Sequence, residues 1–216
     1  MAKFRMQFTK HGDMKYVSHL DMIRLFTRIF HRANLPLAYS EGFNPHPKMS
    51  VLLPLSVGLE SDCEYIDVSF KDTVSMLDCM KGLKGATPIG LDIVKISEVL
   101  ENSAKAKEIR YAEYNIKTDC EISRDDIYNF LSRETIEVLK KTKRSESITD
   151  IKPDIMNLSF INENEFLAVI SAGSEANLKP SVLISAMEEY IDGFNPTDIS
   201  IRRTAILTDR GEPMIK

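Results

Sequence analysis

Two hydrophobic periods alternate along the chain, and the order in which they follow one another constrains the fold more than any other feature. Phe4, Met6 and Phe8 alternate with polar residues, which is the period of a strand with one buried face. Ser18 then opens a helical pattern with an acid three residues later, as in an N-terminal cap. Extended segments follow, ending in EYIDVSF, then the helical pattern TVSMLDCMKGL and the strand-like GLDIVKISEVL. Strand, helix, strand, strand, helix, strand is the split βαβ order of a ferredoxin-like sandwich.

The helical spacing also predicts which side chains of these two helices face the core. Apolar residues that recur at steps of three and four lie along one side of a helix. The residues expected to be buried are Leu20, Ile23, Phe26, Ile29, Phe30 and Ala33 in the first helix, and Met76, Leu77, Met80 and Leu83 in the second.

The second half of the chain nearly repeats this order. The charged, small-residue stretch ENSAKAKEIR, residues 101–110, is typical of a joint between units. After it we expect a helix capped by Ser123, a second helix over KPSVLISAMEEYI, and strands over RYAEYNIKTD, TIEVLKKTK, MNLSFIN, EFLAVIS and TDISIRRTAIL. We therefore predict an α+β fold of two tandem ferredoxin-like (split βαβ) units, residues 1–102 and 108–216, each an antiparallel sheet with helices on one face.

Charge is unevenly distributed. The 216 residues carry a net charge of −4, yet residues 1–50 hold eight Lys and Arg against three Asp and Glu, so that segment carries +5 and the remainder −9. All four histidines also lie in residues 1–50. A basic end on an acidic chain indicates a local anionic partner rather than general attraction to polyanions.

Composition excludes several classes of protein. No apolar run approaches the roughly 20 residues that span a bilayer, and the first residues lack the apolar core of a secretory signal. We therefore expect a cytoplasmic protein with no membrane partner. Cys63, Cys79 and Cys120 are too few and too widely spaced for a disulfide framework or a zinc site, and no metal or cofactor is expected.

The polar side of the first helix carries a row of cations. Asp21 and Arg24 can pair locally, whereas Arg28, His31 and Arg32 have no acid four residues away within the helix. Guanidinium groups in such a row suit bidentate contact with phosphates, so we predict that Arg24, Arg28, His31 and Arg32 bind RNA. The alternative is structural, because cations near a helix C-terminus complement the macrodipole.

The stretch YSEGFNPHPKMS predicts a stiff loop. Each proline fixes its own φ and keeps the residue before it extended, which affects Asn44 and His46. A rigid loop loses little entropy on binding, so we predict that Phe43, Asn44, His46 and Lys48 contact RNA, with Phe43 stacking on a base. A rigid connector with Phe43 packed inward is the alternative. A second cationic stretch, Lys141, Lys143 and Arg144, extends this surface or is only a solvated hairpin.

Two histidines are candidates for catalysis. His19 occupies the first helical position, where the helix dipole favours a neutral imidazole that can act as a general acid or base. His46 lies between the two prolines of the loop.

Several motifs carry a resemblance to a known family. They are F-x-K-x-G-x-x-x-Y-V-S-H-L-D-M-I-R from Phe8, H-R-A-N-L-P-L-A-Y-S-E-G-F-N-P-H-P-K from His31, and L-P-L-S-V-G-L-E-S-D-C-E-Y-I-D-V from Leu53. The chain resembles the radical SAM-associated (radical SAM-linked) bacterial proteins of unknown function. This resemblance implies a separate radical SAM enzyme as partner, because the chain itself lacks the C-x-x-x-C-x-x-C that holds a four-iron cluster.

These observations lead to one expected function and two alternatives. We expect a non-catalytic RNA-interacting accessory module that acts with a separate radical SAM enzyme in RNA or ribosome modification. The first alternative is a metal-independent endoribonuclease that uses His19 or His46, since paired ferredoxin-like units with a basic helix are similar to the CRISPR repeat-RNA endoribonucleases. The second alternative is a protein adaptor that docks the radical SAM partner without touching RNA.

Overall fold

The chain divides into two compact units. The computed structural model describes residues 2–71, 73–141 and 146–215. Unit 1 comprises Met1–Ala106 together with Pro213–Lys216, and unit 2 comprises Lys107–Glu212. Pro213–Lys216 therefore groups with unit 1 although it follows unit 2 in the chain. None of the described helices is long and apolar enough to cross a bilayer.

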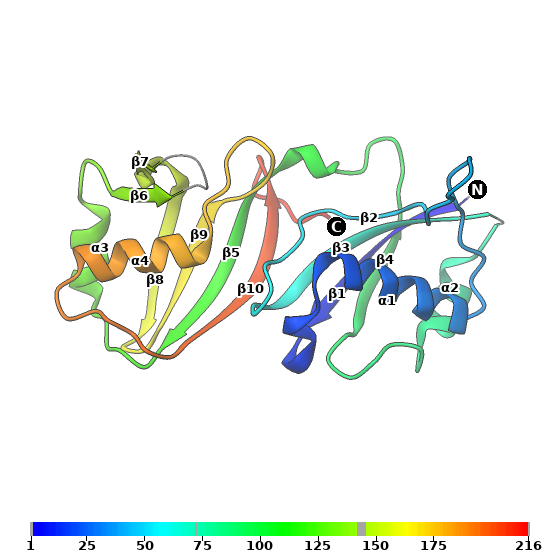
Figure 1. The fold of residues 1–216 in the computed structure, drawn as a ribbon, viewed down its shortest axis with the longest axis horizontal. Helices are drawn as coiled ribbons and strands as arrows, with labels where there is room; N and C mark the ends of the chain where they lie inside the picture. Colours follow the sequence, from blue (N-terminus) through cyan, green and yellow to red (C-terminus); the bar gives the residue numbers. More distant parts are fainter. Residues whose placement is uncertain (1, 72, 142–145, 216) are drawn as a thin grey trace. The chain divides into compact units, whose positions relative to one another are not determined.

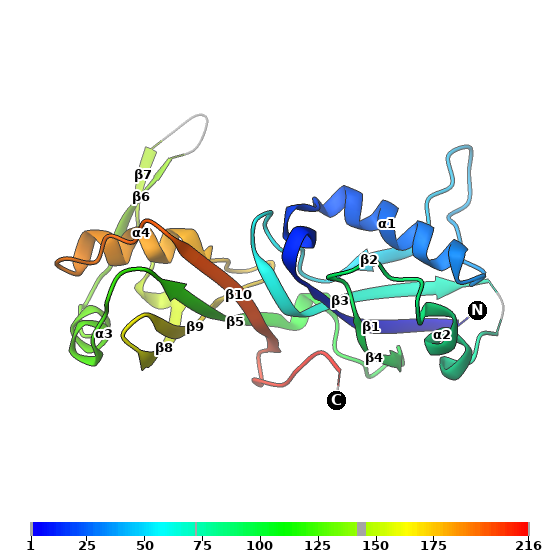
Figure 2. The same cartoon turned by 90° about the horizontal axis from the view of Figure 1, so that it is seen from below.

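Unit 1 is an antiparallel sheet covered on one face by α1. Its elements are β1 (Ala2–Lys10), the 3-10 helix Gly12–Tyr16, α1 (His19–Arg32), β2 (Met49–Val51), β3 (Glu60–Phe70), α2 (Met76–Leu83) and β4 (Ile93–Glu98). The strands lie in the order β4-β1-β3-β2, and every pairing among them is antiparallel. Figures 1 and 2 both show α1 running across one face of β1 and β3.

Aromatic side chains fill the space between α1 and the sheet. Phe4, Met6 and Phe8 point to the helix from alternate positions of β1, as the strand period predicts. Phe26 is fully buried and packs edge-on against Phe8, with ring centroids 4.8 Å apart. Burying a side chain of this size contributes about 1.5–3 kcal/mol, so this cluster is the main reason that α1 lies where it does.

The expected core faces of α1 and α2 need correction. Leu20 is 66% exposed, whereas Met22, which was not expected inside, is buried. The buried stripe of α1 runs through Met22, Phe26, Ile29 and Phe30, and the phase of a 3.6-residue helix turns Leu20 away from it. In α2 the expected residues Met76, Leu77 and Met80 are 43%, 60% and 51% exposed, because only one narrow stripe, Cys79 and Leu83, reaches the core.

Unit 2 is a second antiparallel sheet. The 3-10 helix Ala106–Glu108 begins at the last residue of unit 1 before the division. The elements of unit 2 are then β5 (Ile109–Thr118), α3 (Arg124–Leu131), β6 (Glu137–Lys141), β7 (Glu146–Asp150), the 3-10 helix Lys152–Asp154, β8 (Ile155–Asn162), β9 (Glu165–Ser171), α4 (Pro180–Tyr190) and β10 (Ile199–Thr208). The sheet has the order β10-β5-β9-β8. Helices α3 and α4 contact each other through Phe130 and Tyr190, whose ring centroids are 6.4 Å apart.

The hairpin of β6 and β7 departs from the predicted order. The segment TIEVLKKTK was expected to supply a strand of the sheet, but β6 pairs only with β7 in a separate two-stranded ladder. No strand was predicted for β7, because ESITD contains a single apolar residue, Ile148, and shows no alternation. The general class, a mixed fold of mostly antiparallel sheet with four α-helices among the described residues, is confirmed.

Candidate nucleic-acid interface

The exposed face of α1 begins at a well-formed cap. Ser18 accepts a hydrogen bond from the Asp21 backbone N–H at 3.2 Å, and its hydroxyl donates to the Asp21 carboxylate at 2.8 Å. Arg24 donates to the same carboxylate at 2.8 Å. The hydrogen bond from Ser18, followed by that from Arg24, lowers the pKa of Asp21 below its usual value. The Arg24 guanidinium is thus partly neutralised by a neighbour on its own helix.

The remaining predicted cations of α1 lie in its last turns. Arg28, His31 and Arg32 are all exposed. Arg32 donates a hydrogen bond to the carbonyl oxygen of Ala86, which ties the end of α1 to the segment after α2. Among the described residues, the Arg28 guanidinium makes no hydrogen bond or ion pair, so of the predicted row it is the group most available to an anion.

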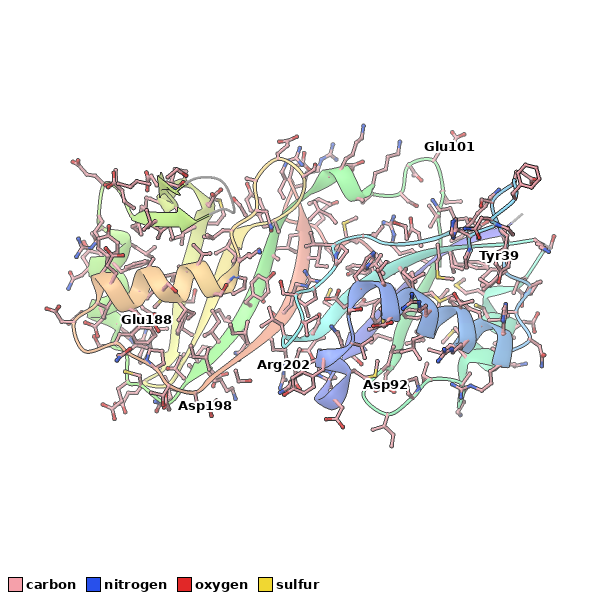
Figure 3. The ribbon with its side chains drawn as sticks, in the orientation of Figure 1. Tyr39, Asp92, Glu101, Glu188, Asp198 and Arg202 are labelled. Carbon is pink, nitrogen blue, oxygen red and sulfur yellow. The ribbon has the colours of Figure 1, made fainter. Side chains whose placement is uncertain are left out.

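The proline-rich stretch after α1 forms a closed loop anchored to that helix. The Ser40 backbone N–H donates to the His46 carbonyl at 2.9 Å, and the His46 N–H donates to Ser40 Oγ at 2.9 Å. At the base, the Tyr39 hydroxyl lies 3.0 Å from Nε2 of His31 on the last turn of α1. Figure 3 labels Tyr39 at this base, and in Figure 2 the loop stands out from the unit.

The tip of the loop is fully exposed. Phe43 has a relative exposure of 111%, and Asn44 and His46 are exposed as well. Gly42 has φ of +111°, a conformation that side chains rarely adopt, which explains a glycine immediately before the tip. The structure therefore places Phe43 outward, where it can stack on a flat ligand, and not inward as a core residue.

Lys48 does not join the cations of α1. Met49 and Val51 of β2 pack on the helix-covered core, so the alternation of the strand turns Lys48 and Ser50 to the opposite face of the sheet. The structure brings His31 together with the loop base and leaves Lys48 on the other side of the unit.

The two candidate catalytic histidines lie apart. His19 is the first residue of α1, whereas His46 is in the loop anchored at the last turn of the same helix. A helix of 14 residues is roughly 20 Å long, so the two imidazoles share no site. The recess that His19 lines encloses about 20 Å³, which is room for little more than a water molecule.

The second predicted cationic stretch is only partly described. Lys143 and Arg144 lie outside the described residues, and for Lys141 the structure gives the backbone, which pairs with Glu146 at the end of the β6–β7 ladder. The prediction that Lys141, Lys143 and Arg144 bind RNA stays a prediction.

Two polar arrangements were missed by sequence reasoning. Arg5 Nε donates to Asp67 Oδ1 at 2.7 Å, and Arg5 Nη2 donates to Asp67 Oδ2 at 3.1 Å, both in a buried setting. Nε2 of His11 lies 3.1 Å from Asp62 Oδ1. Both pairs join residues more than fifty positions apart. The Arg5–Asp67 pair follows from the register of β1 with β3, and the alternation within one strand carries no information on register.

Two buried side chains of unit 1 have raised pKa values. Burial raises the pKa of the Cys79 thiol to about 12, so it stays protonated and unreactive at neutral pH. Burial also raises the pKa of Tyr65, whose hydroxyl lies 3.3 Å from Cys63 Sγ. Within the described ranges, no group of three or more His, Cys, Asp or Glu side chains is arranged to hold a metal ion.

Comparison with known proteins identifies the family. Residues 3–180 match the family described as "Uncharacterized protein conserved in bacteria (DUF2344)". The chain belongs to this family. The family description names neither an activity nor a partner, so it gives no support to the radical SAM link expected from the sequence motifs. No curated protein sequence matches the chain.

Several solved structures align with the chain at low sequence identity. A chain from the "Crystal Structure of a Cbf5-Nop10-Gar1 Complex" aligns with a TM-score of 0.51 at 10% identity, covering 94% of this chain and 48% of that chain. A chain from the "Structure of H/ACA RNP bound to a substrate RNA containing 2'-deoxyuridine" aligns with a TM-score of 0.48 at 10% identity, covering 94% and 47%. The chain thus spans about half the length of these two chains. The acetolactate synthase small subunit from Thermotoga maritima aligns with a TM-score of 0.25 at 8% identity, covering 94% of each chain.

Proposed function

We propose that this DUF2344 protein is a non-catalytic RNA-binding accessory module, and that the last turns of α1 together with the loop 40–46 form its contact surface. The observation that carries the proposal is the His31–Tyr39 contact of 3.0 Å, which anchors the loop beside Arg28 and Arg32. A cationic helix end next to a rigid loop with an exposed aromatic ring combines the two interactions by which single-stranded RNA is held, phosphate pairing and base stacking.

The two units share one strand order. We infer that both units are variants of the ferredoxin-like plan, because β4-β1-β3-β2 and β10-β5-β9-β8 have the same strand order relative to their sequence. In unit 2 the plan is interrupted by the β6–β7 hairpin. The likeness to the Cbf5-Nop10-Gar1 chain concerns the fold alone and adds no argument about a ligand.

The proposal includes a separate radical SAM enzyme as the catalytic partner. This part rests on the resemblance of the N-terminal sequence motifs alone. The alternative, a metal-independent ribonuclease that uses His19 or His46, would have to rely on one of these histidines alone, since the length of α1 separates them. Cleavage of RNA in EDTA that is lost on His19→Ala or His46→Ala would select this alternative.

Fluorescence anisotropy with a labelled single-stranded RNA of about twenty nucleotides tests the surface. The variant R28A/F43A removes one exposed arginine and one exposed aromatic ring from it. The control R210A/Y128A likewise removes one exposed arginine and one exposed aromatic ring, here a tyrosine, from unit 2. We expect R28A/F43A to weaken binding about tenfold or more, because stacking alone contributes roughly 1–3 kcal/mol per base, and the control to change it less than about twofold.

A salt titration adds a second readout. Loss of one phosphate contact should reduce the slope of log affinity against log salt by about one in R28A. If the wild-type protein does not bind RNA at low salt, the RNA proposal fails. In that case, co-purification with a radical SAM enzyme that survives nuclease treatment and is lost in R28E would identify the same surface as a protein-docking site.

A further inference from the structure

The face of the unit 1 sheet that points away from α1 carries a group of polar residues. Strand alternation directs Lys3 and Arg5 of β1, Ser50 of β2, and Asp67 and Ser69 of β3 to this face. The register confirms that they are neighbours, because Arg5 and Ser50 both lie opposite Asp67 and Lys3 lies opposite Ser69. The side chains therefore form one contiguous surface that the RNA contact proposed for α1 does not use.

A cleft of about 950 Å³ opens on this surface. One wall is the sheet, and the other is the segment from Val99 to Ala106 that follows β4. Figure 3 labels Glu101 on that segment. Sites for small molecules and cofactors typically enclose about 300–1,000 Å³, so the cleft is large enough for a nucleotide.

The floor of the cleft is a rigid, neutral ion pair. The buried Arg5 uses its guanidinium on both carboxylate oxygens of Asp67, on the Ala104 carbonyl at 2.6 Å and on the Met214 carbonyl at 3.1 Å. These bonds fix the second wall against the sheet through Ala104. Because Arg5 and Asp67 neutralise each other, the charge that a ligand meets comes from the residues around them.

The residues around the floor are predominantly cationic. Lys3 has a side chain that is 49% exposed and lies 3.5 Å from Asp67, and Lys48 and Lys105 are exposed on the rim. If the neutral Arg5–Asp67 pair is set aside, Glu101 is the acidic residue among the lining residues, and the three lysines outnumber it. Hydroxyl groups of Ser50 and Ser69 supply further hydrogen-bond donors.

We propose that this cleft binds the phosphate groups of a nucleotide or of an RNA strand. Lysine ammonium groups and serine hydroxyls are donors suited to phosphate oxygens. The described residues that line the cleft include no aromatic side chain, so recognition is by phosphate and not by base stacking, in contrast to the loop that carries Phe43. The proposal goes beyond the RNA surface proposed for α1 and does not depend on it.

Binding of two defined probes to the full chain tests the cleft. The probes are ADP and a single-stranded RNA of twelve uridines, measured by isothermal titration calorimetry at low salt. The variant K3Q/K48Q removes two cations of the cleft. The control K81Q/K84Q removes two exposed lysines at and after the end of α2. We expect K3Q/K48Q to weaken at least one probe about tenfold or more, since each charged hydrogen bond lost has an effect of this order, and the control to change it less than about twofold.

The pattern of results separates the ligand sources. Weakened ADP binding identifies a nucleotide site, and weakened RNA binding with no ADP binding identifies a backbone site. Amide NMR shifts at Ser50 and Ser69 on addition of the affected probe locate it in the cleft. The proposal is overturned if neither probe binds, if both variants weaken binding equally, or if RNA binding is lost in R28A/F43A but unchanged in K3Q/K48Q while ADP does not bind. The last result would leave the RNA surface on α1 intact.

Discussion

The paired strands at the centre of the two sheets hold polar groups of very different character. In unit 1, Arg5 on β1 faces Asp67 on β3, and both side chains are at most 10% exposed. In unit 2, the corresponding strands β5 and β9 carry Asn115, which donates to Glu165 at 2.7 Å, with Lys117 3.6 Å from the same carboxylate and 59% exposed. A buried charge must be paired within the fold, whereas water can replace the partner of a partly exposed charge at little cost. Of these two pairs, the one in unit 1 is therefore shielded from water, whereas the Lys117 end of the one in unit 2 is not.

The connection between the first helix and the second sheet strand differs in the same way. Unit 1 fills it with the proline-rich loop 40–46, which Ser40 and His46 close through two hydrogen bonds. Unit 2 fills it with the β6–β7 hairpin, a ladder of five paired positions. Each unit thus places its additional structure at the same point of the fold, once as a rigid loop and once as regular strand pairing.

The largest expected effect comes from breaking the buried pair. Arg5→Leu removes the buried partner of the Asp67 carboxylate and leaves the half-exposed Lys3, 3.5 Å away, as a neighbouring cation. It should lower the free energy of unfolding of unit 1 by about 3 kcal/mol, the lower end of the cost of breaking a buried ion pair. Asn115→Ala in unit 2 should cost about 0.5–1.5 kcal/mol, the net value of one hydrogen bond. Hydrogen exchange measured by mass spectrometry on peptides of β1 and β5 reads each unit separately. Equal losses in the two units would contradict the comparison.

Gly42→Ala should be next in size and local to the loop. A side chain at φ of +111° introduces strain of about 1–2 kcal/mol. We expect faster amide exchange at Ser40 and His46 with little change in the sheet. The matched variant Gly193→Ala, also at positive φ with open space around it, should leave the loop unaffected. If G42A instead speeds amide exchange across the whole of unit 1, the loop is not an independent element.

Replacing the N-cap serine of one helix in each unit compares the two units by the same substitution. Ser18 caps α1, and Ser123 caps α3 in a capping box with Asp126. Ser18→Ala and Ser123→Ala should each cost about 1 kcal/mol in the unit that contains the helix. Urea denaturation monitored by circular dichroism measures the overall loss. Amide hydrogen exchange in α1 and α3 measures the loss in each unit. A loss that spreads equally to both units would show that they unfold as one.

Acid should produce the smallest effect, and a larger one in unit 2. A hydrogen bond from Thr197 lowers the pKa of Asp119, and one from Asn115 lowers the pKa of Glu165. A carboxyl whose pKa is lower in the folded state stabilises the protein above its unfolded pKa, and this contribution is lost as pH falls below about 4 through the folded value. In unit 1 the corresponding group is Asp21.

The pH dependence can be assigned with one variant. Asp119→Asn should flatten the fall in unit 2 stability between neutral pH and the acid range, as measured by urea denaturation at a series of pH values. Asp192→Asn, at another exposed aspartate of unit 2, is the control. If the dependence of unit 2 stability on pH is unchanged in D119N, Asp119 does not contribute to it.

The sequence predicts features that depend on a few consecutive residues. Phe4, Met6 and Phe8 gave the buried face of β1, and Ser18 and Ser123 were found at the caps of α1 and α3. Both signals are local, since alternation and capping need only residues within one turn or one strand. They survive in the fold because tertiary contacts do not compete with them.

Features that depend on distant partners were not predictable. The exposed Leu20 and Met80 show that apolar spacing in a helix leaves its rotational phase open when more than one stripe is apolar. Lys48 was assigned to the same surface as Arg28, but its direction is set by the pairing of β2 with β3. The Arg5–Asp67 pair likewise required the register of two strands.

The hydrogen bond from Arg5 to the Met214 carbonyl joins residues 209 positions apart, so it can form only late in the synthesis of the chain. A ribosome releases Arg5 early and Met214 only after all of unit 2 has been made, so unit 2 has its complete sequence before unit 1 does. Until then, one acceptor of the Arg5 guanidinium is missing and water takes its place. A gene fragment that ends at Ala106 would encode every strand and helix of unit 1 and still lack this last contact.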